Sequence, residues 1–167
     1  SRPTTRTSDR STPVTSSDAL AAVPPSAAAL LSVPDTPGEI TEAGLRSNVN
    51  VGIQYISSWL RGNGAAAIYG LMEDPATAEI SRAQVWQWIR HGTELDDGRA
   101  VSPELVRELA GLELERIREE IGDDEWFENE GRPRLSRELF ERVALSGDEL
   151  VEFLTLPAYD ELLKLER

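Results

Sequence analysis

The chain has 167 residues, of which 30 are acidic and 17 basic, so its formal net charge is -13. This excess of negative charge disfavours binding to nucleic acids and to anionic membrane surfaces. Cysteine is absent and histidine occurs once, which excludes disulfides and thiolate chemistry and argues against a histidine-based metal site or catalytic triad. Any catalysis by this chain must therefore depend on carboxylates and arginines.

Targeting signals are not apparent in the sequence. No apolar run approaches the roughly 20 residues that a membrane-spanning helix needs, and the N-terminus lacks a basic-then-apolar signal pattern. The last three residues are not a peroxisomal address of the Ser-Lys-Leu type. We therefore expect a cytoplasmic location. The chain begins with Ser1 instead of Met, as expected of a processed chain or a fragment.

The first 38 residues differ in composition from the rest. Residues 1 to about 18 are mainly Ser, Thr, Arg and Pro, which bury too little apolar surface to offset the entropy of ordering a backbone. Residues 26–31 could form a short helix before a loop rich in Pro and Gly. We expect residues 1–38 to be a disordered or weakly ordered linker, and residues 39–167 to form the folded domain.

Capping signals and apolar spacing predict helices through the folded domain. The first begins at Thr41, a candidate N-cap, and ends at Arg61, before Gly62. Its apolar stripe recurs at three- and four-residue spacing at Leu45, Val49, Ile53, Ile56 and Leu60. A short helical piece is expected over residues 65–69. The next helix follows residue 77 and ends at Gly92.

The second half of the chain is also predicted to be helical. Ser102 followed by Pro103 is a strong helix start, and that helix should end at Gly122. A loop containing Trp126 and Phe127 should follow. Further helices are then expected over residues 137–145, 146–154 and 158–165, the second of them capped by Ser146. Because no alternating strand pattern or strand–helix repeat occurs, the predicted fold class is an all-α helical bundle.

An acidic pair, Glu73 and Asp74, precedes Pro75 near the second helix. Proline disfavours the α conformation at the residue before it, while its own fixed φ suits the first helical position. Asp74 is therefore expected at a loop-to-helix junction, where a carboxylate commonly caps the helix by accepting backbone N–H groups. Judged from this spacing alone, capping is the favoured interpretation of Asp74.

The longer string around this junction resembles the C-terminal segment of malate synthase, in the shorter bacterial and plant type called isoform A. The resemblance runs from about Leu30 to Leu163. The segments that carry it, in the order and spacing of that family, are residues 40–46, 48–55, 59–64, 71–88 and 152–159.

This resemblance implies a C-terminal fragment of an enzyme that condenses acetyl-CoA with glyoxylate and hydrolyses the thioester, giving malate and CoA in the glyoxylate cycle. In that family a β/α barrel binds Mg²⁺ and glyoxylate and supplies an arginine that stabilises the enolate, while the C-terminal helical domain delivers an aspartate as general base. The matching position here is Asp74. Met72 looks like a residue that lines the pantetheine channel, so it is a candidate acetyl-CoA contact.

The sequence also departs from this family. No β/α repeat is present, and a barrel alone needs about 250 residues. The metal ligands and the catalytic arginine are therefore expected outside this chain, which should be inactive alone. Pro75 stands where the family pattern has Ala. The alternative left open is a stand-alone acidic helical module that binds a protein partner and has no activity.

Other candidate residues have simpler interpretations. His91 is expected to compensate a helix dipole at the surface. Arg61 and Arg82 are candidate contacts for CoA phosphates, although exposed arginines beside glutamates usually form weak surface ion pairs. The tryptophans Trp59, Trp86 and Trp88 are expected to pack in the core or at a domain interface.

Overall fold

The computed structural model describes residues 26–27 and 38–165, and the side chains up to residue 164. The predicted linker over residues 1–38 therefore lies outside the described residues, except at 26–27 and 38. The predicted short helix over residues 26–31 also lies largely outside them. Among the described residues, no helix is long and apolar enough to cross a membrane.

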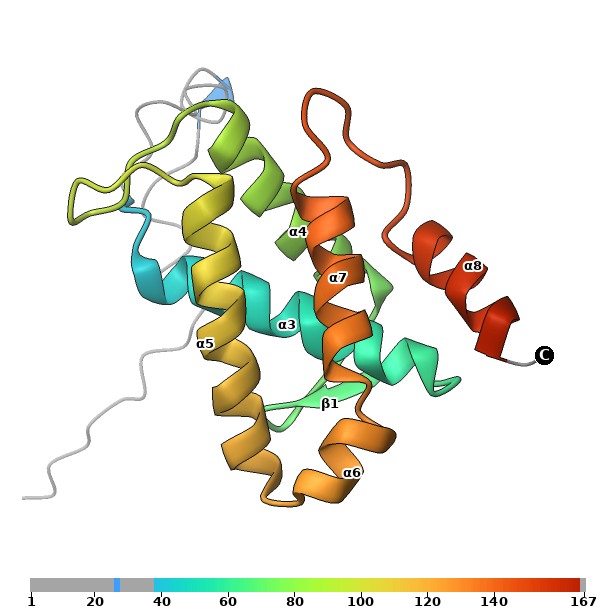
Figure 1. Ribbon diagram of the computed structural model, residues 1–167. Helices are drawn as coiled ribbons and strands as arrows, with labels where there is room; N and C mark the ends of the chain where they lie inside the picture. The colour runs from blue at the N-terminus through green and yellow to red at the C-terminus, as the bar shows by residue number, and fades with distance from the viewer. Residues whose placement is uncertain (1–25, 28–37, 166–167) are drawn as a thin grey trace, which may run out of the picture. The chain divides into compact units, whose positions relative to one another are not determined.

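Helix α3, Glu42–Leu60, is the central element of the folded domain (Figure 1). Its N-cap is Thr41, whose hydroxyl accepts a hydrogen bond from the Gly44 amide at 3.0 Å. The predicted apolar stripe is confirmed, since all five of its residues are buried. Helices α4, α5, α7 and α8 and strand β1 all contact α3.

The other helices surround α3, and α5 and α7 cross it side by side in Figure 1. Their bounds are α4 Pro75–Arg90, α5 Pro103–Ile121, α6 Asp124–Asn129, α7 Pro133–Ala144 and α8 Thr155–Leu165. The predicted start of α5 is confirmed, because the Ser102 hydroxyl accepts from the Leu105 amide at 3.2 Å. Its predicted end is also confirmed, with Gly122 in the left-handed region at φ 66°. The all-α fold class is confirmed apart from one short hairpin.

That hairpin replaces the short helical piece predicted over residues 65–69, and the prediction is wrong. Ala66–Ile68 is strand β1, and it pairs antiparallel with strand β2, Leu71–Glu73. The two connecting residues, Tyr69 and Gly70, have φ of 50° and 79°. Positive φ at both central positions is typical of a type I′ turn, whose twist matches that of paired strands. This turn chemistry outweighs the helix propensity of the alanines.

Two predictions in the second half of the chain are also wrong. Residues 124–129 form helix α6 instead of a loop, because the Asp123 carboxylate caps it by accepting from the Trp126 amide at 2.9 Å. Residues 146–154 are not helical. Ser146 does not cap a helix there, since its hydroxyl donates to the Glu149 carbonyl at 2.7 Å and closes a turn.

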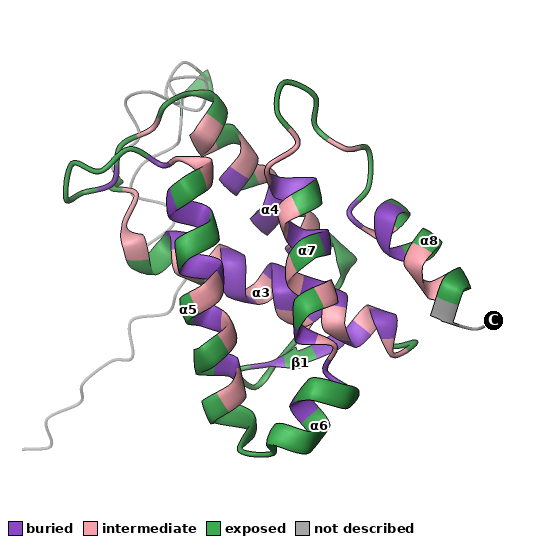
Figure 2. Cartoon of the chain, in the orientation of Figure 1, coloured by how far each residue is buried: buried purple, intermediate pink, exposed green. Residues whose placement is uncertain are grey.

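The core lies between α3 and the helices around it, as the buried inner faces in Figure 2 show. Its largest fully buried apolar side chains are Tyr55, Phe140, Leu45, Ile53, Ile56, Leu60, Leu109 and Leu154. Helix α7 approaches α3 closely at Gly52, where an added Cβ would lie 2.5 Å from two atoms of the Phe140 ring. The absence of a side chain at Gly52 therefore sets the α3–α7 spacing.

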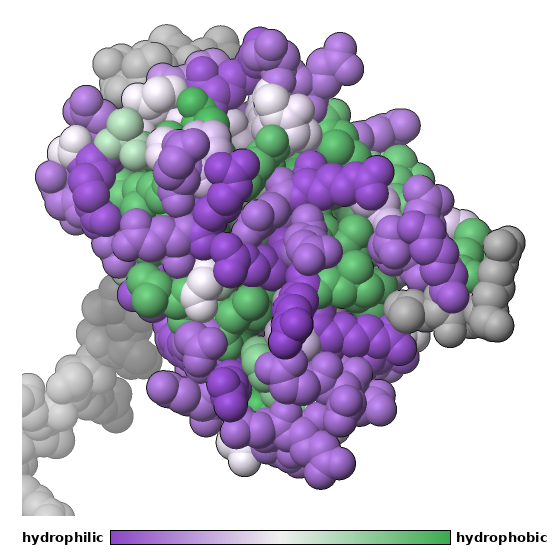
Figure 3. Space-filling model, in the orientation of Figure 1, coloured by the Kyte–Doolittle hydropathy of each residue, from purple (hydrophilic) through white to green (hydrophobic). Residues whose placement is uncertain are grey.

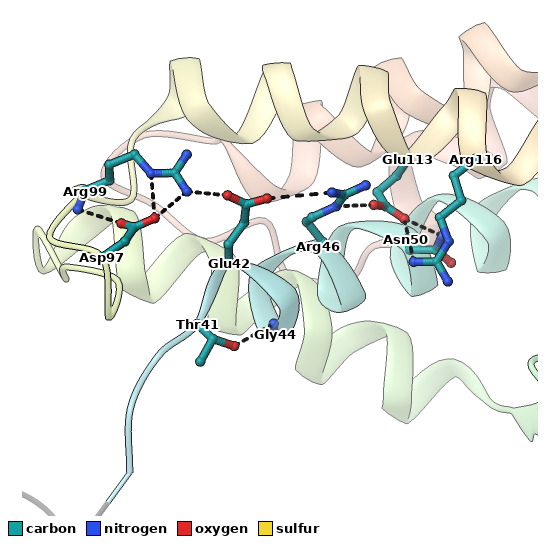
Figure 4. A network of polar contacts seen from close by, with 9 residues as sticks. All are labelled: Thr41, Glu42, Gly44, Arg46, Asn50, Asp97, Arg99, Glu113 and Arg116. Carbon is teal, nitrogen blue, oxygen red and sulfur yellow. Dashed lines mark hydrogen bonds and ion pairs between the residues drawn. The ribbon is translucent and has the colours of Figure 1, made fainter.

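A buried carboxylate joins α3 to α5 (Figure 4). Glu113 is 0% exposed and accepts from Arg46 Nε at 2.5 Å and from Asn50 Nδ2 at 2.8 Å. Arg46 also pairs with Glu42, which accepts from Arg99. Buried charges are tolerated only when they are paired and hydrogen-bonded, and Glu113 meets both conditions.

Replacement of Glu113 by alanine should destabilise the domain by about 2–3 kcal/mol, because the buried Asn50 amide and the Arg46 guanidinium lose their shared acceptor. Urea denaturation followed by circular dichroism measures the change. The matched control is Glu115→Ala in the same helix, where the side chain is mostly exposed and stability should stay near that of the wild type. Equal losses in the two variants would contradict this role for Glu113.

A carboxylate presented at the junction of a hairpin and a helix

Strand β2 and helix α4 position Asp74 between them. The residue is the N-cap of α4, with extended backbone angles of φ -100° and ψ 176°, and Pro75 is the first helical residue. The loop-to-helix junction predicted from Pro75 is therefore confirmed. The chain leaves the hairpin extended and turns into α4 directly after the Asp74 side chain.

The Asp74 carboxylate lies at the surface of the domain. Its Oδ1 accepts from the Thr77 backbone amide at 3.0 Å and lies 3.4 Å from the Thr77 hydroxyl. Among the described residues, no hydrogen bond reaches Oδ2 and no cation lies within ion-pair distance of this carboxylate. Asp74 thus caps α4 with one oxygen, while the other is free of hydrogen bonds to the described residues.

The capping role predicts a difference between two substitutions of Asp74. Asp74→Ala should lower the free energy of unfolding by about 1 kcal/mol, because the Thr77 amide loses its acceptor. Asp74→Asn should leave stability near the wild-type value, since asparagine is as good an N-cap as aspartate. Urea titration of the two variants measures this difference. Equal stability of Asp74→Ala and the wild type would contradict the capping role.

The tip of the hairpin before Asp74 is held against α5. The guanidinium of Arg116 lies 5.4 Å from the centroid of the Tyr69 ring, within the range of a cation–π contact. Burial, followed by a hydrogen bond to the Glu120 carboxylate, raises the pKa of the Tyr69 phenol. These contacts connect the tip of the hairpin to α5.

A buried phenol lies near the junction, on α3. Tyr55 is fully buried, and its hydroxyl donates to the Gly64 carbonyl at 3.0 Å. Burial raises the pKa of Tyr55, and the negative charges of Asp74 and Glu79 raise it further. The phenol therefore remains neutral and supplies a rigid, uncharged support beneath the junction.

The first turns of α4 are tied to the segment before α8. Glu79 Oε1 accepts from the Leu154 amide at 2.6 Å, and Glu79 Oε2 accepts from Arg82 Nε at 2.6 Å. Arg82 Nη2 donates to the Glu152 carbonyl at 3.2 Å. Arg82 is only 2% exposed, so the interpretation of this residue as an exposed CoA-phosphate contact is wrong. Arg82 instead holds α4 against residues 152–154.

Exposed apolar side chains lie on the hairpin, on α4 and around α8. Met72, on β2 two residues before Asp74, is 70% exposed and available to a ligand or a partner. The other large apolar side chains exposed on the hairpin, α4, α8 and the segment before α8 are Tyr69, Leu71, Ile80, Leu150, Phe153, Leu156, Tyr159 and Leu163. Exposed apolar surface of this kind marks interaction sites in soluble proteins.

Trp59, Trp88 and His91 take the structural positions predicted from the sequence. Trp59 and Trp88 pack partly buried against the core, as expected, and Trp86 donates to the Gly147 carbonyl at 2.9 Å. His91 is exposed at the C-terminal end of α4. In the described part of the chain, no three Asp, Glu or His side chains are grouped as a metal ion requires, so these residues do not fit Mg²⁺.

Sequence reasoning did not identify Tyr55 and Glu79 as neighbours of Asp74. Glu79 and Arg82 have the i, i+3 spacing of a helical ion pair, which is a local signal. Their contacts to residues 152–154 span about 70 positions of sequence and have no local signal.

Fold and junction together define a helical domain in which the exposed Asp74 carboxylate lies between the hairpin and α4, on elements that also carry exposed apolar side chains. Residues 39–162 match the family described as malate synthase, C-terminal. The chain therefore belongs to the malate synthase family, and the resemblance inferred from the sequence is confirmed.

Individual relatives agree with this assignment. The chain is 52% identical over 136 residues to malate synthase from Streptomyces clavuligerus, covering 81% of this chain and 25% of that protein. It is 48% identical over 122 residues to malate synthase A from Escherichia coli K12, covering 73% of this chain and 22% of that protein. It is 45% identical over 126 residues to the glyoxysomal malate synthase of Zea mays, covering 74% of this chain and 22% of that protein. The chain thus spans about a quarter of the length of these relatives.

Proposed function

We propose that residues 39–162 act as the C-terminal domain of a malate synthase, and that Asp74 is the general base of the reaction. The reaction is the condensation of acetyl-CoA with glyoxylate, followed by thioester hydrolysis, as in the glyoxylate cycle. The observation that best supports this proposal is the exposed Asp74 carboxylate, which keeps one oxygen unbonded among the described residues while the other caps α4.

The chemistry assigned to Asp74 is a single proton transfer. Its carboxylate takes a proton from the methyl carbon of acetyl-CoA, and the C–H electron pair moves into the enolate. The enolate carbon then forms a bond to the aldehyde carbon of glyoxylate, whose oxygen takes up a proton. Water finally cleaves the thioester of malyl-CoA to give malate and free CoA. A carboxylate is a weak base toward carbon, so the enolate needs preorganised positive charge.

That positive charge is proposed to come from the rest of the enzyme. Among the described residues, no cation lies within ion-pair distance of Asp74, and Mg²⁺ finds no fitting group of ligands. The three-quarters of the relatives that this chain does not match are the proposed source of the arginine, the metal ligands and most of the acetyl-CoA contacts. These 167 residues alone are then expected to be inactive.

The exposed apolar side chains on the hairpin and around α8 are proposed to pack against that remaining part. Met72 is proposed to contact acetyl-CoA, because residues two apart in an extended segment project to the same side, which brings Met72 toward Asp74. The proposed location is the cytoplasm, although relatives from Zea mays and Brassica napus are named glyoxysomal.

Reconstitution from two polypeptides tests the proposed function. The chain is mixed with Escherichia coli malate synthase A that lacks the matched C-terminal segment, in the presence of Mg²⁺, glyoxylate and acetyl-CoA. CoA release is followed with a thiol reagent, to which this chain contributes no background because it has no cysteine. We expect activity only in the mixture. A complex detected by sedimentation that releases no CoA would contradict the proposal and favour a binding module without activity.

A further inference from the structure

A pocket of about 80 Å³ lies between α3, β1, α5, α6 and α7. Its wall combines the polar side chains of Gln54, Ser57, Ser58, Arg61 and Ser136 with apolar side chains, including those of Ile53, Ile68, Leu114, Ile117, Phe127 and Pro133. In Figure 3, apolar residues show through the hydrophilic surface in this region, between α5 and α7 and above α6. One water molecule needs roughly 10–15 Å³, so the pocket can hold a larger apolar group.

One end of this pocket is positively charged. Arg61 lines it, and its Nη1 donates to the Ser57 hydroxyl at 2.6 Å. The Arg61 guanidinium lies 4.9 Å from the centroid of the Trp126 ring, which also lines the pocket. Burial, then the neighbouring charge of Arg132, lowers the pKa of Arg61, while Glu130 acts weakly in the opposite direction. A guanidinium held in this way has little freedom to turn toward solvent.

Neither Arg61 nor Arg132 has a carboxylate within ion-pair distance in the described part of the chain. Arg132 Nη1 instead donates to the Leu60 carbonyl at 2.8 Å. Most of the other described arginines do form ion pairs, as expected in a chain of net charge -13. The two guanidiniums beside the pocket therefore carry positive charge that no ion pair among the described residues neutralises.

An unsatisfied hydroxyl also lines the pocket. Ser136 is 0% exposed, and its Oγ has no hydrogen-bond partner among the residues that the structure describes. An unpaired buried hydroxyl is energetically unfavourable, so such groups are usually satisfied by water or by a ligand. The neighbouring Ser57 hydroxyl is already used, since it donates to the Gly131 carbonyl at 2.7 Å.

We propose that this pocket binds a small aliphatic carboxylic acid, with the carboxylate at Arg61 and Ser136 and the hydrocarbon chain against the apolar wall. The planar guanidinium fork matches a carboxylate in two parallel hydrogen bonds. A single negative charge on an apolar body suits this wall better than a phosphate, whose strongly hydrated dianion would lose more solvation. The site does not include Asp74, so it would be a second ligand site on the domain.

Titration of the intact 167-residue chain with pentanoate tests this proposal. Binding is followed by amide ¹H–¹⁵N correlation spectra and by the intrinsic tryptophan fluorescence, to which Trp126 contributes. We expect saturable shifts concentrated at Ile117, Phe127 and Ser136. Pentanamide has nearly the same shape but no charge, and it should bind at least tenfold more weakly. Equal binding of pentanoate and pentanamide to the wild-type chain would overturn the proposal without the need for any variant.

Variants of the pocket give the second arm of the test. Arg61→Gln should weaken pentanoate binding at least tenfold, and Ser136→Ala should weaken it several-fold. The matched control is Arg134→Gln, which removes an exposed positive charge one residue beyond Pro133 of the pocket wall and should leave the affinity unchanged. Spectra of each variant verify its fold. Equal affinity of wild type and Arg61→Gln, or equal losses in Arg61→Gln and Arg134→Gln, would overturn the proposal.

Discussion

Asp74→Asn is expected to lower malate formation by about 10²–10⁴-fold, the range in which general acid–base groups contribute. The substitution is best made in a chimera in which residues 39–162 replace the matched segment of the Escherichia coli relative. The amide cannot accept the methyl proton, but it still accepts the Thr77 N–H and caps α4. Turnover should therefore fall while the KM for acetyl-CoA and the melting temperature stay near those of the unmutated chimera.

The adjacent carboxylate provides the matched control. Glu73 ends strand β2 and is half-buried, one residue before Asp74. Glu73→Gln removes the same charge from the same junction, so it reproduces any general electrostatic effect on acetyl-CoA binding. We expect its turnover to stay within a few-fold of the unmutated chimera. A large loss of turnover in Glu73→Gln together with near-normal turnover in Asp74→Asn would identify Glu73, and not Asp74, as the general base.

Gly52→Ala is expected to destabilise the domain by about 2–3 kcal/mol, an effect of overpacking. Its Cβ would lie 2.5 Å from Cδ2 and Cε2 of Phe140, a fully buried ring that cannot move without displacing α7. The higher helix propensity of alanine, worth about 1 kcal/mol, offsets only part of this cost. Urea denaturation of the isolated chain measures the difference.

The control for this prediction is Gly111→Ala, the same substitution in the middle of α5. There the nearest atom to the new Cβ is Nη1 of the flexible Arg137 side chain, at 3.5 Å, which is ordinary contact distance. Only the propensity term remains, so Gly111→Ala should stabilise the domain by about 0.5–1 kcal/mol. If both alanines shifted stability in the same direction, the close α3–α7 approach would not explain the presence of Gly52.

Helix boundaries could be predicted where a local signal marks them. Thr41 and Ser102 cap α3 and α5 through contacts to amides three residues ahead, so the sequence pattern suffices. The β1–β2 hairpin could not be predicted in the same way. Its strands have three residues each, too few to show an alternating pattern. Its turn places Tyr69 at positive φ, a backbone conformation that tyrosine rarely adopts.

The position of Asp74 was also predictable, because Pro75 constrains the backbone on both sides of the junction. The surroundings of Asp74 were not predictable. The contacts of Glu79 and Arg82 with residues 152–154 join distant parts of the chain, and only tertiary packing creates them. The same applies to the pocket at Ser136, which five separate elements enclose.

Exchange of the acetyl-CoA methyl hydrogens with solvent tests most directly whether Asp74 removes a proton from carbon. The chimera is incubated in D₂O with acetyl-CoA, Mg²⁺ and oxalate, which resembles glyoxylate but lacks an electrophilic aldehyde. Deuterium in the methyl group is followed by NMR. We expect incorporation with Asp74 and none above the buffer rate with Asn at that position. Equal incorporation by the two proteins would contradict the assignment of Asp74 as the base.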